Sequence, residues 1–235
     1  MSGHGAIDVG RPAGRADRHP PGPAGRRRRA GAAVARLGDV AIAATASFVV
    51  LIGVLHLLRP DVDPIQRPTS EYAVGPFGWL MTAAFLSLSA ATWALVIGLH
   101  RDLTGAARSR LGVAALGAFG IGLVVAAAFP IDLDGAPPTV AGTVHAINGP
   151  LTFLSLIVGV SLVSRRLQHD ARWRPVHRIA WPLALLLMVE FVGGGLAAAT
   201  TTGAGIAQRL LLVTFATWFV LVGARLRSDA TGRAT

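Results

Sequence analysis

Residues 111–129 read LGVAALGAFGIGLVVAAAF, a run of 19 residues without a charged side chain. At 1.5 Å per residue a helix of this length covers about 28 Å, close to the ~30 Å hydrocarbon core of a bilayer. A charge at the bilayer centre costs about 2.5–3.5 kcal/mol even on the most lenient scale, so a charge-free run is typical of a transmembrane helix. The stretch therefore predicts a membrane-spanning segment in the middle of the chain.

Further apolar segments flank this one, and each approaches the roughly 20 residues that a helix needs to cross a membrane. The chain of 235 residues is 52% hydrophobic and only 14% charged, whereas a soluble domain carries about 25% charged residues. We therefore predict an all-α fold, an integral membrane bundle of six transmembrane helices. The expected spans are about 37–58, 77–99, 111–129, 142–164, 179–200 and 206–224.

The segment before the first span has a different composition. Residues 1–34 are rich in glycine, proline and arginine and lack hydrophobic periodicity. Such a segment buries too little apolar surface to offset the entropy of ordering it. We predict a disordered basic tail over 1–34, a six-helix transmembrane domain over 35–227 and a cytoplasmic tail over 228–235.

The basic residues predict the orientation in the membrane. All 22 of them are arginines, and with six alternating spans all but Arg59, Arg67 and Arg209 fall on the side that holds both termini. Cytoplasmic loops carry the excess of basic residues, so we predict both termini inside and the plasma membrane as the location. The same rule explains the net charge of +10, so we expect no nucleic-acid partner. Membrane lipids are the expected surroundings, and a membrane-protein partner or a second copy of the chain stays open.

Four short motifs occur in a fixed order along the predicted helices. They are EYAVGPFGWLM at 71–81, FPID at 129–132, the set Thr139, Gly142 and His145, and GIAQR at 205–209. Together they resemble the DUF998 family of bacterial and archaeal membrane proteins over about residues 37–226. The resemblance implies a six-helix integral membrane protein and no established activity. Gln208 departs from the family pattern, in which glutamate is expected more often.

Polar side chains inside membrane segments are candidate functional residues, because lipid penalises them. Glu190 is the one acidic residue deep in a predicted helix. It suits a proton or cation site or a general acid or base. The structural alternatives are an ion pair with Arg209 or a neutral carboxylic acid bonded to a neighbouring helix. Most of the polar set falls in the outer half of the predicted bundle. This candidate polar cluster consists of Glu190, His145, Arg209, Asp132, Glu71, His56 and Asn148.

Three functions fit this cluster. We favour the handling of a small molecule, an ion or a lipid, with a structural or accessory subunit of another membrane protein as the second interpretation. An intramembrane metal-dependent hydrolase is the third, with His56 and His145 as ligands beside Asp132 or Glu71. The histidines lack the spacing that places two on one helix face, so we predict no metal and no cofactor, and whether the protein is an enzyme stays open.

The loop over 165–178 mixes arginines with an aromatic residue, in the sequences Arg165-Arg166 and Arg172-Trp173-Arg174. Tryptophan is enriched at membrane–water interfaces, and clustered arginines attract anionic headgroups. The loop therefore suits anionic lipid, with Trp173 expected at the interface.

Overall fold

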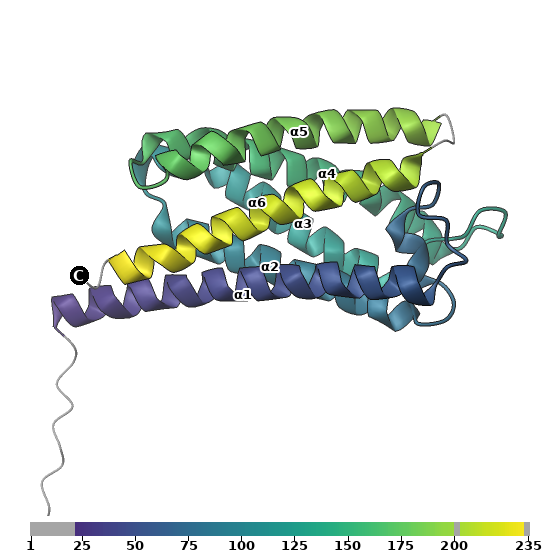
Figure 1. Ribbon diagram of the computed structural model, residues 1–235, viewed down its shortest axis with the longest axis horizontal. Helices are drawn as coiled ribbons and strands as arrows, with labels where there is room; N and C mark the ends of the chain where they lie inside the picture. The colour runs from purple at the N-terminus through teal and green to yellow at the C-terminus, as the bar shows by residue number, and fades with distance from the viewer. Residues whose placement is uncertain (1–21, 200–202, 233–235) are drawn as a thin grey trace, which may run out of the picture.

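A computed structural model describes residues 22–199 and 203–232, in which six long helices form one elongated bundle (Figure 1). All six are long and apolar enough to cross a membrane, which confirms the predicted all-α membrane bundle. The long helices are α1 (Pro23–Leu58), α2 (Gly78–Asp102), α3 (Arg110–Ala128), α4 (Val140–Arg166), α5 (Arg174–Ala199) and α6 (Ala204–Gly232). Short 3-10 helices are η1 (Thr69–Ala73), η2 (Gly105–Ala107) and η3 (Leu167–His169).

The start of α1 differs from the prediction. The helix begins at Pro23, within the segment that we predicted to be disordered, and the prediction for residues 1–21 lies outside the described residues. Proline is tolerated in the first helical turn, where its missing N–H would have no partner. With 36 residues α1 is about 54 Å long, so one end extends beyond the hydrocarbon core.

The first turns of the predicted span of α1, and the turn before it, pack against α6. A Cβ on Gly38 would lie 2.5 Å from the carbonyl oxygen of Gly223, so the two backbones touch at a point where no side chain fits. Val34, one turn earlier, is 4% exposed. Because α6 itself continues to Gly232, into the predicted tail, α1 has a partner surface beyond the membrane span.

The helices pack as neighbours in a ring-like order. α1 contacts α2 and α6, α3 lies between α2 and α4, and α5 contacts α4 and α6. α5 is the least enclosed helix, since 17% of its apolar window is buried. Aromatic rings from α1, α3 and α6 pack in the core at centroid distances of 5.7–6.2 Å, namely Phe48, Phe119, Phe215, Trp218 and Phe219.

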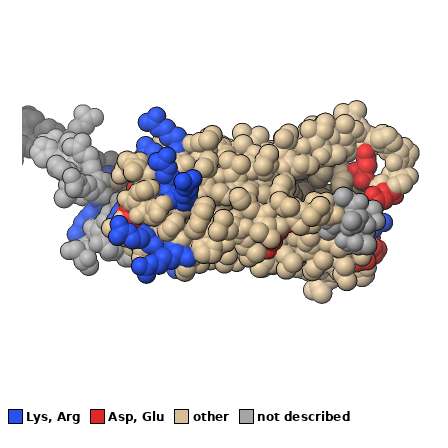
Figure 2. Space-filling view, turned by 90° about the horizontal axis from the view of Figure 1, so that it is seen from above, with Lys and Arg blue, Asp and Glu red and all other residues tan. Residues whose placement is uncertain are grey.

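Charge divides the bundle into two ends. Figure 2 shows arginines gathered at one end and most of the visible carboxylates at the other. We name them the arginine-rich end, which carries Arg110, Arg165 and Arg166, and the acidic end, which carries Asp61 and Asp132. The start of α1 and the end of α6 both lie at the arginine-rich end (Figure 1), as an even number of crossings requires.

Candidate functional site

His56 and Arg209 meet at the acidic end, where the loop after α1 rests on the start of α6. Arg209 Nε donates to His56 Nε2 at 2.8 Å, and His56 Nδ1 lies 2.7 Å from the carbonyl oxygen of Ile52. Because Nε2 accepts a hydrogen bond, the ring carries its proton on Nδ1 and donates it to Ile52. Arg209 also donates to Arg67 O at 2.8 Å, Gly205 O at 3.0 Å and Tyr72 Oη at 3.4 Å.

Residues next to Arg209 complete the contact between this loop and α6. Gln208 Oε1 accepts from the backbone N–H of Thr69 at 2.7 Å and from its hydroxyl at 3.1 Å. A glutamate would accept both hydrogen bonds equally, so the departure from the family pattern leaves this contact intact. The Glu71 side chain is 5% exposed and pairs with Arg67 at 2.8 Å.

Arg59 holds the same loop in shape, and the sequence analysis counted it only as an outer charge. Its side chain is 7% exposed and forms a two-pronged pair with Asp61 at 2.7 and 2.8 Å. Nη1 donates to the carbonyl oxygens of Val74 at 2.8 Å and Pro76 at 3.1 Å. Gly75 between them has a φ of +89°, which glycine adopts freely. The guanidinium holds the pKa of Asp61 below its usual range.

Asp132 and His145 close the connection between α3 and α4. Asp132 accepts from the backbone N–H of Thr139 at 2.8 Å and from its hydroxyl at 2.7 Å, and these hydrogen bonds lower the pKa of Asp132. The Thr139 hydroxyl in turn accepts from Gly142 N at 3.0 Å and caps α4. His145 Nδ1 lies 2.8 Å from the carbonyl oxygen of Phe129. A Cβ on Gly142 would collide with the Asp132 carboxylate, so this position suits glycine.

Asn148 joins α4 to α3 below this connection. Its amide nitrogen donates to the carbonyl oxygen of Gly122 at 2.9 Å, and its oxygen accepts from the Thr152 hydroxyl at 3.2 Å. Both functional atoms of the amide are therefore engaged, the nitrogen with α3 and the oxygen within α4.

Glu190 lies apart from these residues, on α5 facing α6. Its Oε1 accepts from the Thr214 hydroxyl at 2.8 Å. Its Oε2 is buried and has no hydrogen-bond partner in the described part of the chain. Of the alternatives for Glu190, the ion pair with Arg209 is not formed, because Arg209 is oriented by His56 and by backbone carbonyls. The contact that is present is the hydrogen bond to the neighbouring helix α6.

The candidate cluster thus separates into three groups rather than one convergent site. One group is at the α1–α2 loop and α6 (His56, Glu71, Arg209), one at α3 and α4 (Asp132, His145, Asn148), and Glu190 stands with Thr214. Among the described residues, no three His, Asp or Glu side chains are arranged to hold a metal ion.

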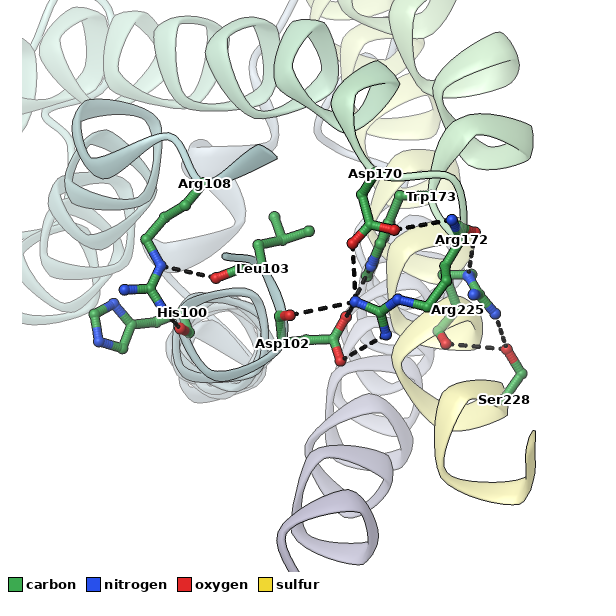
Figure 3. A network of polar contacts seen from close by, with 9 residues as sticks. All are labelled: His100, Asp102, Leu103, Arg108, Asp170, Arg172, Trp173, Arg225 and Ser228. Atoms are coloured by element: carbon green, nitrogen blue, oxygen red, sulfur yellow. Dashed lines mark hydrogen bonds and ion pairs between the residues drawn. The ribbon is translucent and has the colours of Figure 1, made fainter. Parts of the chain in front are cut away.

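A polar network at the arginine-rich end was missed by sequence reasoning (Figure 3). The Asp102 side chain is 0% exposed and accepts from Trp173 Nε1 at 2.8 Å. Arg172 Nη2 lies 3.4 Å from Asp102 Oδ2 and 2.9 Å from Asp170 Oδ2. Arg225 Nε donates to the carbonyl oxygen of Arg172 at 3.0 Å, and its guanidinium carbon lies 5.9 Å from the centre of the Trp173 ring.

The buried position of Trp173 contradicts the prediction made from the sequence. It is 0% exposed, whereas we expected it at the lipid interface. A buried carboxylate requires donors, and the indole N–H and Arg172 supply them to Asp102. The signal that could have identified the network is Asp102 itself, a single acid in the last turn of α2 next to His100 and Arg101.

Comparison with known proteins gives one match. A family model described as a protein of unknown function (DUF998) matches residues 24–225, and it confirms the resemblance found in the motifs. No curated protein and no solved structure matches the chain.

Proposed function

The chain belongs to the DUF998 family of proteins of unknown function, and from this premise we propose that it is a multi-pass membrane protein that binds a small molecule, an ion or a lipid at Glu190. The observation that carries the proposal is the buried Oε2 without a partner among the described residues, beside an Oε1 that Thr214 holds. A buried acceptor left unpaired costs about 1–3 kcal/mol. A ligand with a hydrogen-bond donor or a positive charge would supply the partner that Oε2 lacks.

The packing of α5 supports a route for such a ligand. Leu186 and Val189 on its outer surface are 45% and 69% exposed within the protein, so this face of the helix meets lipid. Glu190 lies about 14 Å along the helix from its end at Ala199. A molecule dissolved in the bilayer would reach the carboxyl between α5 and α6 without crossing the core, which favours a mainly apolar ligand with one donor group.

The remaining candidates are better explained as structural residues. Arg209, Asp132 and Asn148 each bond a neighbouring element through their functional atoms. Both ring nitrogens of His56 are engaged, which disfavours the metal-dependent hydrolase, because an imidazole ligates through a free nitrogen. We therefore reduce the predicted seven-residue cluster to Glu190, supported by Thr214.

A second candidate function uses the same carboxyl. A Cβ on Gly193 or Gly195 would meet nothing within 4 Å, so another helix could approach this stretch of α5 closely. For this second function the protein is an accessory subunit, and a polar group of the partner helix forms a hydrogen bond with Oε2 of Glu190.

We also propose that the arginine-rich end faces the cytoplasm and that the membrane is the plasma membrane. The support is the distribution of arginines, since Arg59, Arg67 and Arg209 are at the acidic end and the loops of the opposite end carry basic residues.

Replacing Glu190 by leucine tests the proposal. A residue retained for ligand binding often lowers the stability of the protein. Glu190→Leu removes the unpaired buried oxygen, so we expect it to raise the free energy of unfolding by about 1–3 kcal/mol. The Thr214 hydroxyl can then bond the carbonyl one turn back in its own helix. The measurement is denaturation of the purified protein in mixed micelles, followed by circular dichroism.

Asn148→Leu is the matched control, because it is the same kind of replacement at a satisfied polar residue between helices. It should lower stability by about 1–2 kcal/mol, since Gly122 O and the Thr152 hydroxyl lose their partner. If Glu190→Leu destabilises the protein as much as Asn148→Leu does, Glu190 is a structural residue and the proposal is wrong. Gly193→Leu separates the two candidate functions, because it blocks helix association and leaves small-molecule binding in place.

A further inference from the structure

Two adjoining hollows open at the arginine-rich end, where η2 and the start of α3 meet the end of α4. Their volumes are about 510 Å³ and about 490 Å³, and they share Leu162 and Arg166. We call them together the arginine groove. Its lining includes Arg108, Arg110, Arg165, Arg166, Leu111 and Leu162.

No carboxylate in the part of the chain that the structure describes neutralises the positive charge of the groove. Arg110, Arg165 and Arg166 form no ion pair with a carboxylate of the described chain, and neither does Arg108. Arg172 nearby differs, because Asp170 and Asp102 flank it. Four like charges along the two adjoining hollows raise the local concentration of anions.

Two of these guanidinium groups are oriented in advance. Arg108 donates Nε to the carbonyl oxygen of Leu103 at 2.8 Å and Nη2 to that of His100 at 2.6 Å, as Figure 3 shows. Arg166 Nη1 donates to Ala106 O at 3.2 Å. These bonds fix the planar groups while leaving further N–H donors for a ligand. Guanidinium groups bind phosphate oxygens in pairs, so the fixed geometry suits phosphate.

The groove also has an apolar side. Leu111 is 67% exposed and Leu162 is half-buried, and both belong to helices that cross the membrane. A free anion gains nothing from these side chains, whereas an acyl chain buries them. We infer that the arginine groove binds the phosphate headgroup of an anionic phospholipid, whose acyl chain lies along Leu111.

This site shares Arg165 and Arg166 with the lipid-binding loop expected from the sequence, and it adds Arg108 and Arg110 from the connection between α2 and α3. Trp173 and Arg172 are used within the protein, in the network around Asp102. The groove does not involve Glu190, so the inference stands or fails separately from the proposed function.

The test compares two double variants that lose the same charge at the same end. Arg110→Gln/Arg165→Gln removes two exposed groove arginines, and Arg101→Gln/Arg178→Gln removes two exposed arginines outside the groove. Full-length protein in detergent is mixed with phosphatidylglycerol or phosphatidylcholine of the same chain length, and native mass spectrometry measures the bound lipid. Each basic residue near a membrane surface contributes about fivefold to affinity, so the groove variant should bind phosphatidylglycerol roughly thirtyfold more weakly. The control pair should change this affinity by less than about threefold.

Three results would overturn the inference. Equal losses in both pairs would mean that the attraction is diffuse, and equal binding of the two lipids would mean that headgroup charge is not recognised. Displacement of phosphatidylglycerol by millimolar inorganic phosphate would assign the groove to a free anion. Circular dichroism checks the fold of each variant, and the single Arg110→Glu change, with at least a fivefold loss expected, replaces the double variant if that one does not fold.

Discussion

Trp173→Ala should lower the free energy of unfolding by about 3–5 kcal/mol. The indole is fully buried, and its removal leaves a cavity between α2, α5 and α6. It also removes the donor that lies 2.8 Å from Asp102 Oδ2, and the Asp102 side chain is 0% exposed. A buried carboxylate that loses a donor adds to the cost of the cavity. Denaturation in mixed micelles, followed by circular dichroism, measures the change.

Two variants serve as controls for this prediction. Trp79 is 69% exposed on α2, so Trp79→Ala should change stability by less than about 1 kcal/mol. Trp173→Phe keeps most of the ring but not the N–H, and we expect a loss of about 1–2 kcal/mol. Equal effects of Trp173→Ala and Trp79→Ala would mean that Trp173 faces lipid, as the sequence alone suggested.

Arg209→Leu should lower the free energy of unfolding by about 2–4 kcal/mol. Its guanidinium connects α6 to α1 through His56 and to the α1–α2 loop through the carbonyl oxygen of Arg67. Leucine makes neither bond, and the acceptors at the junction lose their donor. The same denaturation experiment measures the loss.

Arg101→Leu is the control for Arg209→Leu, because Arg101 is exposed in the last turn of α2. We expect a change within about 0.5 kcal/mol. If the free energies of unfolding of the two variants differ by less than about 0.5 kcal/mol, Arg209 does not stabilise the contact of α6 with α1 and the α1–α2 loop.

The helices could be predicted from the sequence because the bilayer imposes one length and one polarity on every span. The charge-free run at 111–129 corresponds to α3 (Arg110–Ala128), within one residue at each end. The start of α1 could not be predicted in this way, because residues 23–34 follow no hydrophobic period. At the end of this segment α1 packs against α6, where Gly38 meets Gly223 and Val34 is buried.

The partners of the polar residues were harder to predict, because they depend on how each helix is rotated and on where the loops fold back. The positions of Glu190 and Arg209 along their predicted helices suggested that the two side chains would meet. The rotation of α6 instead presents Thr214 to Glu190 and turns Arg209 towards His56. Likewise, nothing in the spacing indicated that Trp173 would reach back 71 positions to Asp102.

Labelling with a membrane-soluble carbodiimide tests most directly whether Glu190 is a binding carboxyl that a molecule dissolved in the bilayer can reach. Dicyclohexylcarbodiimide partitions into lipid and modifies carboxyl groups that it can reach from there. Because Glu190 belongs to α5, the least enclosed helix, and its Oε2 has no hydrogen-bond partner among the described residues, we predict one adduct per chain. Peptide mass spectrometry should locate the adduct at Glu190 and find none in Glu190→Gln. An unmodified Glu190 in the folded protein, at reagent concentrations that label other carboxyl groups, would contradict the proposed binding site.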